Sequence, residues 1–201
     1  MPSLGHLAVG LAAGRLHAGD ERPRLAASVL FTLLATFPDL DAWARRLGAG
    51  PRSEWLHRGA SHSLAAAAAA ALVATLIAGG MGRSRARMGL TALLVAASHG
   101  LLDTFTRGGA GVMLLWPHSA ARLLAPWTPI PASPFLPRLL SGRGLEVLLL
   151  EAAVFSPLLV YAAWPRRRGQ RADPRGQKMK ERRTPGAPAV LEWSDSRSRR
   201  R

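Results

Sequence analysis

The chain lacks cysteine entirely and has few aromatic residues. The absence of cysteine excludes disulfide bonds and thiolate ligands, so any metal ion must be bound by histidine and carboxylate side chains. Aromatic residues make up only 6% of the 201 residues, and the apolar residues are mostly Ala and Leu. Together with abundant Gly and Pro, this composition is typical of closely packed helices rather than of sheets.

Acidic residues are scarce as well. The chain contains 12 Asp and Glu against 27 Lys and Arg, and 13 of these basic residues lie in residues 166–201. The net charge of +15 is compatible with nucleic acid or an anionic membrane surface as a partner. Because this segment has one tryptophan, Trp193, and no binding-fold signature, we expect no nucleic-acid partner. We interpret residues 166–201 as a disordered, basic, cytoplasmic tail near anionic membrane lipid.

Long apolar segments predict five helices. The expected helices cover residues 4–18, 25–37, 64–80, 88–104 and 145–164. Pro38 is expected to end the second helix, because proline disfavours a helical conformation in the residue before it. The fifth helix is the strongest candidate for a membrane span, although it contains Pro157.

The predicted fold class is all-α. The helices are apolar around their whole circumference, which favours a membrane over a soluble Ala- and Leu-rich bundle, the alternative. Residues 1–165 are therefore expected to form a multi-pass membrane bundle of about five helices. If the tail is cytoplasmic, the loops 14–24 and 82–88 lie on the same side as the tail, and these three segments carry 19 Lys and Arg. The outer segments, 39–63 and 104–144, carry 8. The positive-inside rule favours this orientation.

The same topology places four polar helix ends together on the outer side. These ends carry His6, then Asp39 and Asp41, then His57 and His62, then His99 and Asp103. His99 and Asp103 are four residues apart and therefore share one helix face. Each pair has an ordinary explanation, as a local ion pair or as a turn or cap. Ionisable residues within a membrane are costly and usually functional, so together these residues indicate a metal site.

Imidazole and carboxylate ligands suit Zn²⁺, with Mn²⁺ or Fe²⁺ as alternatives. The candidate ligands are His6, Asp39, Asp41, His57, His62, His99 and Asp103. These seven residues exceed one tetrahedral site, so we expect one or two ions. Two ions can activate water and stabilise the leaving oxygen of a phosphoester. A general base is expected among the catalytic candidates Asp39, Asp41 and Asp103.

Other polar residues near these motifs have two interpretations each. Arg58 is suited to a substrate phosphate, and equally to an ordinary interface position. Four hydroxyl residues are suited to hydrogen bonds with the ligands, and equally to helix capping. They are Ser61, Ser63, Ser98 and Thr106. His118 is interpreted as an interfacial histidine outside the site.

The order of the motifs resembles that of one known family. The motifs are Gly5-His6, Pro38-Asp39-Leu40-Asp41, His57-Arg58-Gly59-x-x-His62-Ser63 and Ser98-His99-x-x-Leu102-Asp103-x-x-Thr106-x-x-Gly109. Over about residues 1–160 they resemble the YdjM family of inner-membrane metal-dependent hydrolases. That order is in turn similar to the zinc-dependent phospholipase C and P1 nuclease group of helical phosphodiesterases. The late HxxxE of the soluble phospholipases is missing, since neither Glu146 nor Glu151 has a histidine at that spacing.

The resemblance implies a bacterial inner-membrane hydrolase that acts on a phosphoester or a lipid-linked substrate. A second hypothesis is a non-enzymatic membrane protein, with a structural metal or polar cluster and a tail that binds a partner. A small transporter is a third hypothesis, but the five uneven helices show no inverted repeat.

Overall fold

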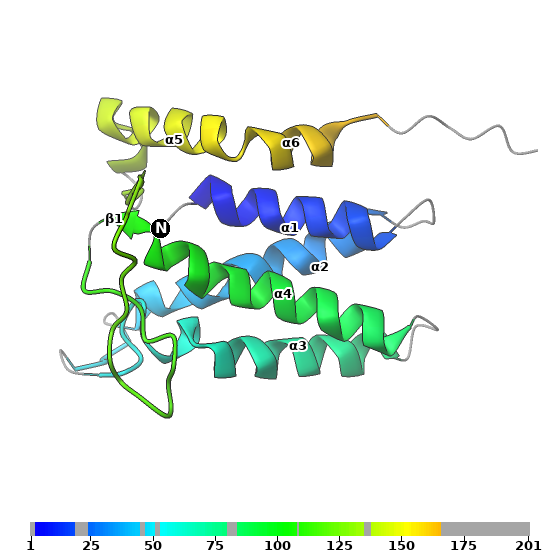
Figure 1. The fold of residues 1–201 in the computed structure, drawn as a ribbon, viewed down its shortest axis with the longest axis horizontal. Helices are drawn as coiled ribbons and strands as arrows, with labels where there is room; N and C mark the ends of the chain where they lie inside the picture. The colour runs from blue at the N-terminus through cyan, green and yellow to red at the C-terminus, as the bar shows by residue number, and fades with distance from the viewer. Residues whose placement is uncertain are drawn as a thin grey trace, which may run out of the picture. The chain divides into compact units, whose positions relative to one another are not determined.

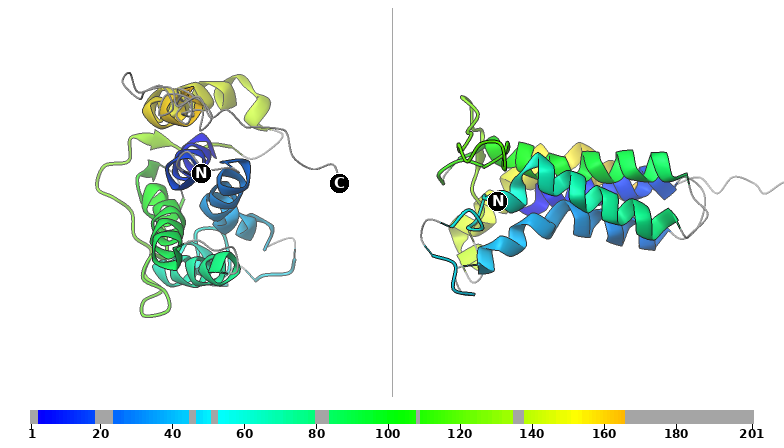
Figure 2. Two further views of the ribbon diagram at one scale, coloured as in Figure 1. Left: turned by 90° about the vertical axis from the view of Figure 1, so that its right-hand side faces the viewer. Right: turned by 90° about the horizontal axis from the view of Figure 1, so that it is seen from below.

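The computed structural model describes residues 3–18, 24–44, 47–50, 53–79, 84–107, 109–134 and 138–165. The tail predicted at residues 166–201 lies outside the described residues. Four helices form a bundle, which Figure 2 shows end on: α1 (Ser3–Ala18), α2 (Arg24–Thr36), α3 (Leu64–Gly79) and α4 (Arg85–Thr104). Two further helices, α5 (Gly142–Val154) and α6 (Ser156–Ala163), pack on α1 (Figure 1).

The first four helices agree with the sequence-based expectation within a few residues. Pro38 ends α2 as expected, because α2 stops at Thr36 and the chain continues as the 3-10 helix η1 (Phe37–Trp43). The expectation of one helix over residues 145–164 is wrong. The described chain forms two helices there, α5 and α6, with a bend of 70° between them. Pro157 lies in the first turn of α6, where its missing N–H has no helical partner to lose.

Helices α1 and α2 touch through their backbones. A Cβ atom on Gly10 would lie 2.5 Å from Cα of Thr32, and one on Gly14 would lie 2.4 Å from Cα of Ser28. The two glycines are four residues apart on one face of α1, and because they lack side chains α2 can approach closely. Phe31, which is fully buried, fills the centre of a bundle core that is otherwise mostly alanine.

Large apolar side chains cover the outside of the bundle. Leu25 is 76% exposed, Leu76 is 69% exposed and Leu94 is 62% exposed. In the described part of the chain, Leu25–Trp43 is long and apolar enough to cross a membrane, and the bent pair α5 and α6 is a second candidate. The apolar stretch Leu64–Ile77 in α3 is shorter. The outer surface therefore suits contact with hydrocarbon.

The connector between α4 and α5 departs from the all-α expectation. Strands β1 (Thr106–Arg107) and β2 (Ile130–Pro131) pair in parallel, and the 3-10 helix η3 (Arg138–Leu140) precedes α5. The connector also bonds to the start of α3, because the Leu64 N–H donates to the Leu114 carbonyl at 3.0 Å. A further 3-10 helix, η2 (Ala60–His62), precedes α3. The connector thus holds η2 at one end of the bundle.

The α1–α2 contact generates a prediction on stability. Replacing Gly14 with Ala raises intrinsic helix propensity, but the new methyl group would overlap the backbone of Ser28. We expect Gly14→Ala to lower the free energy of unfolding by about 1–3 kcal/mol, measured by thermal unfolding in detergent. The matched control is Gly142→Ala, where a Cβ meets no atom within 4 Å. Equal midpoints for the two variants would contradict this account of the contact.

Candidate metal centre

Four chain segments bring all seven predicted ligands to one end of the bundle. His6 lies in the first turn of α1, and Asp39 and Asp41 lie in η1. His62 ends η2, with His57 just upstream, and the last two turns of α4 carry His99 and Asp103. His17 lies near the opposite end of α1, where its ring packs beside Phe31. His118 is exposed and belongs to neither group of candidate ligands found among the described residues.

Asp39, His62, His99 and Asp103 form the inner group, in which one ligand atom from each lies within 4.8 Å of the others. Nε2 of His62 is 3.6 Å from Oδ1 of Asp39 and 3.5 Å from Oδ2 of Asp103. Nε2 of His99 is 3.3 Å from Oδ1 of Asp39. Hydrogen bonds between such atoms are usually shorter, at about 2.7–3.2 Å. Ligands about 2.1 Å from one tetrahedral ion, in contrast, lie about 3.4 Å apart.

The inner group contains buried polar atoms that have no hydrogen-bond partner among the described residues. They are Oδ1 of Asp39, Nε2 of His62, Nε2 of His99 and both carboxylate oxygens of Asp103, of which Oδ2 forms an ion pair with Arg58. Both ring nitrogens of the neighbouring His6 also lack a hydrogen-bond partner. A buried polar group without a partner costs free energy, and a buried carboxylate costs more. A cation at the point where these atoms converge would satisfy several of them at once, so the residues present fit a metal ion.

Contacts behind the histidines fix their ring orientation. Nδ1 of His99 lies 2.6 Å from the Ala35 carbonyl oxygen, so this nitrogen carries the proton and Nε2 presents a lone pair to the group. Nδ1 of His62 lies 3.0 Å from Oδ2 of Asp41, which selects the same tautomer. This carboxylate–histidine arrangement is typical of metal ligands.

His6 extends the inner group from α1. Its ring stacks on that of His99, with ring centroids 3.7 Å apart, and its Nε2 lies 3.5 Å from Oδ1 of Asp103. The start of α1 therefore adds a third imidazole to the buried end of α4.

Asp41, His57 and His62 form the outer group. Asp41 already accepts several hydrogen bonds: Nδ1 of His57 is 2.8 Å from one oxygen, and the Ser61 hydroxyl is 2.5 Å from the other. The backbone N–H of Arg58 also donates to Asp41, at 3.2 Å. His57 is the most open of the four candidate histidine ligands, with 28% of its side chain exposed. The outer group thus links the buried inner group to the surface.

The charge of His62 reflects its three carboxylate neighbours. Burial alone would lower the pKa of His62, but the three nearby carboxylates, that of Asp103 most of all, raise it to about 10. Without a cation, the group therefore retains a proton at neutral pH. Binding a metal ion would release that proton, as is general for histidine ligands.

Arg58 is buried and pairs with a candidate ligand. Its Nε lies 3.2 Å from Oδ2 of Asp103, and its backbone has a φ of 65°, which is uncommon for a residue with a side chain. The Met113 N–H donates to the Arg58 carbonyl at 3.0 Å. Arg122 donates to that carbonyl and to those of His57 and Gly111. The phosphate-binding role of Arg58 stays a prediction, and the structure adds Arg122, which no sequence motif marked.

The four predicted hydroxyl residues divide into two kinds. The Ser61 hydroxyl donates to Asp41 and lies 3.0 Å from Nδ1 of His62. Ser63 caps α3 by accepting the Ala66 N–H at 3.0 Å. Ser98 and Thr106 donate to the backbone carbonyls of Val95 and Leu102. Of the four hydroxyl groups, only that of Ser61 forms a hydrogen bond with the side chain of a candidate ligand among the described residues.

Gly100 allows the two ligand segments to meet. A Cβ atom at Gly100 would lie 2.2 Å from the His62 carbonyl oxygen. Any larger residue would therefore push η2 away from α4 and separate His62 from the neighbouring His99.

Glu151 supports the site from α5, and sequence reasoning missed this role. Its side chain is fully buried and accepts the Leu4 N–H at 2.8 Å and the Ser133 hydroxyl. The carboxylate thus lies at the N-terminus of α1, where a helix favours negative charge. It fixes the turn that carries His6. The only signal in the sequence was an isolated acidic residue in an apolar helix.

Comparison with known proteins identifies the family of this bundle. Residues 1–169 match the YdjM inner membrane protein family. The chain belongs to the YdjM family. The inner membrane protein YbcI of Escherichia coli (strain K12) is 39% identical over 145 residues, which are 68% of this chain and 82% of that relative. No solved structure matches the chain.

Membership of the YdjM family confirms the resemblance seen in the motifs and places the chain in the inner membrane. The matched residues include the whole bundle and all seven candidate ligands.

The inner group generates a prediction on metal binding. We expect the purified protein to contain a divalent ion, and His62→Ala and His99→Ala to lose it, because each removes a nitrogen aimed at the group. Elemental analysis of the purified proteins measures this. His118→Ala, which removes an exposed histidine outside both groups, is the control and should keep the ion. Equal metal content in all four proteins would rule out the assigned ligands.

The contact of Glu151 with α1 generates a prediction on stability. In Glu151→Gln the carboxylate is lost and an amide takes its place at the helix N-terminus. Because the amide replaces a buried, hydrogen-bonded carboxylate, we expect Glu151→Gln to lower the free energy of unfolding by about 1–3 kcal/mol. The matched control is Glu146→Gln on the same helix, since Glu146 is exposed. The account of Glu151 is wrong if thermal unfolding of the two variants is the same.

Proposed function

We propose that this YdjM-family protein is a membrane-bound metal-dependent hydrolase of a phosphoester or lipid-linked substrate. The observation that carries the proposal is the convergence of buried carboxylate and imidazole atoms that lack hydrogen-bond partners among the described residues and lie at the spacing of metal ligands. The resemblance of the motif order to helical zinc phosphodiesterases supports the reaction class.

The inner group would hold the ion, and Zn²⁺ suits its nitrogen and oxygen donors. When bound, such an ion supplies an activated water and polarises the oxygen of an ester. Asp41 would orient His62 rather than bind the ion, because its oxygens already accept hydrogen bonds from His57 and Ser61. One ion is therefore favoured over two.

The remaining roles follow from exposure. Asp39 is the most exposed of the three aspartates, at 16% of its side chain against 5% for Asp41 and none for Asp103. The oxygen of Asp39 that does not hold the ion is therefore the best placed of the aspartate oxygens for general-base catalysis. His57 and its partner Asp41 lie between the inner group and solvent, so this pair is well placed to move a proton to or from a substrate.

We also propose a multi-pass topology with the tail cytoplasmic and the metal centre on the outer side. The excess of Lys and Arg in the tail and in the loops on its side supports this orientation.

One observation favours a second function, a structural metal site without turnover. Asp39, His62, His99 and Asp103 supply four ligands, and four protein ligands are typical of closed structural zinc sites. An ion there would tie η1, η2 and α4 together without an open position for substrate.

Hydrolysis of a soluble phosphodiester in detergent separates the two functions. We expect zinc-dependent hydrolysis by the wild type and by His118→Ala, and its loss together with the ion in Asp39→Asn. Metal retention without hydrolysis of a broad panel of phosphoesters and carboxylic esters would establish the structural role instead.

Asp41→Asn tests the assignment of one ion. Loss of a residue that orients a ligand lowers metal affinity by about 10–100-fold, rather than abolishing it. We therefore expect Asp41→Asn to bind zinc more weakly, as measured by competition with a chromogenic chelator. Complete loss of one of two bound ions would instead make Asp41 a direct ligand of a second ion.

A further inference from the structure

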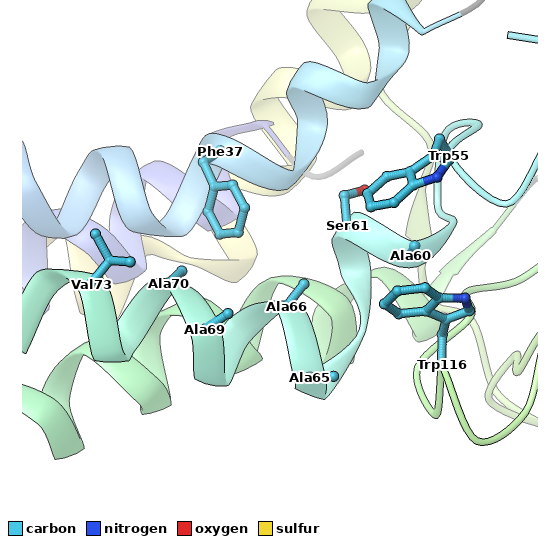
Figure 3. A pocket seen from close by; sticks show the side chains of 10 residues that line it. All are labelled: Phe37, Trp55, Ala60, Ser61, Ala65, Ala66, Ala69, Ala70, Val73 and Trp116. Atoms are coloured by element: carbon cyan, nitrogen blue, oxygen red, sulfur yellow. The ribbon is translucent and has the colours of Figure 1, made fainter.

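A groove of about 460 Å³ lies beside the candidate metal centre (Figure 3). Its floor is the first half of α3, where small side chains face the opening. These are Ala65, Ala66, Ala69, Ala70 and Val73. The floor is about 12 Å long, at about 1.5 Å per helical residue. Its size is typical of a ligand site, since such sites are commonly about 300–1,000 Å³.

One wall and one end of the groove are aromatic. Phe37, at the start of η1, faces the alanines of α3, and Trp55 and Trp116 stand at the other end of the floor from Val73 (Figure 3). The two indole rings meet edge to face, with centroids 5.8 Å apart. Nε1 of Trp116 donates to Glu54 at 2.8 Å. Tryptophans with an apolar body and a hydrogen-bonded tip are typical of the membrane–water interface.

The aromatic end of the groove adjoins the metal centre. Ser61 lines the groove, and its hydroxyl also donates to Asp41. Asp41 in turn holds His62. A molecule lying on the alanine floor would therefore place its polar end near Ser61 and the outer group.

The other end of the groove opens towards apolar surface. Val73 lines the groove and is 56% exposed, and Leu72, Leu76 and Ile77 in the same half of α3 are 60–69% exposed. Since the protein is in the inner membrane, this surface is the part of α3 most suited to contact lipid tails. The groove thus joins an apolar, lipid-facing surface to a polar, metal-binding one.

We propose that this groove binds one acyl chain of a membrane phospholipid whose head group is presented to the metal centre. The proposal rests on the proposed function and names its substrate class, a phospholipid or a phospholipid-linked group. The residues of the floor and the aromatic wall bind the acyl chain, and the head group begins near Ser61.

A helix from a second copy of the protein is the rival occupant, because small residues four apart also suit helix packing. The surroundings of the groove favour the acyl chain. One end of the groove opens on exposed apolar side chains, and the other reaches Ser61 beside the polar metal centre. An amphipathic lipid requires both ends, whereas an apolar helix packed on the alanines would have no use for the polar one.

The first test compares lipid labelling of the wild type with that of a variant whose groove is filled by a larger side chain. Wild-type protein in phosphatidylethanolamine and phosphatidylglycerol nanodiscs is photolabelled by a phospholipid that carries a diazirine on its acyl chain. We expect the label on peptides that contain residues 65–73 or the two tryptophans, and a loss of most of it in Ala69→Leu. The matched control is Ala68→Leu, on the same helix but outside the groove, which should keep the label. Metal content and thermal unfolding verify that both variants fold.

Equal labelling of Ala69→Leu and Ala68→Leu, or labelling of the wild type only elsewhere, would overturn the proposal. A second measurement uses the absence of natural cysteine. Ala69→Cys should stay monomeric under a short thiol cross-linker in nanodiscs. Efficient dimer formation by Ala69→Cys, and not by Ala68→Cys, would show that a second copy occupies the groove and would also overturn the proposal.

Labelling does not require turnover, so its outcome is separate from that of the proposed function. Groove labelling in a protein that hydrolyses no ester would retain the lipid site and overturn the hydrolase. Hydrolysis of a soluble phosphodiester without groove labelling would retain the hydrolase and overturn the lipid site.

Discussion

The structure depends on how three aspartates at one end of the bundle, one buried and two half-buried, are compensated. Asp39, Asp41 and Asp103 lie within a few ångströms of four histidines and one arginine, with little access to water. Asp41 is satisfied by hydrogen bonds, whereas oxygens of Asp39 and Asp103 lack them among the described residues. Buried carboxylate oxygens without hydrogen bonds are costly, so a bound cation provides the most direct explanation for this arrangement.

The rest of the molecule holds these groups in place. Glu151 fixes the first turn of α1, and Arg122 gathers three carbonyls of the loops around Arg58. The smallness of Gly100 lets η2 lie against α4. Each of these residues touches backbone rather than a candidate ligand side chain, so the geometry of the centre rests on contacts between segments far apart in the chain.

The surroundings of the centre connect it with the membrane. The bundle exposes large apolar side chains, as expected of an inner-membrane protein. Alanines on α3 leave a groove that reaches Ser61, at the edge of the centre. A polar, cation-binding end and an apolar flank therefore adjoin, which is the arrangement that an amphipathic lipid requires.

From the sequence alone one can predict that histidine and carboxylate are the available ligand types, where the first four helices lie and which polar residues gather at one end of the bundle. Cysteine is absent, apolar runs and Pro38 bound the helices locally, and helix counting placed the polar ends on one side. How the groups pair depends on tertiary contacts that join distant residues, such as Leu4 with Glu151 and Ala35 with His99. The bend between α5 and α6 and the β1–β2 pairing were missed for the same reason. Helix periodicity indicates which residues three or four positions apart share a helix face, whereas contacts between distant residues depend on how the whole chain packs.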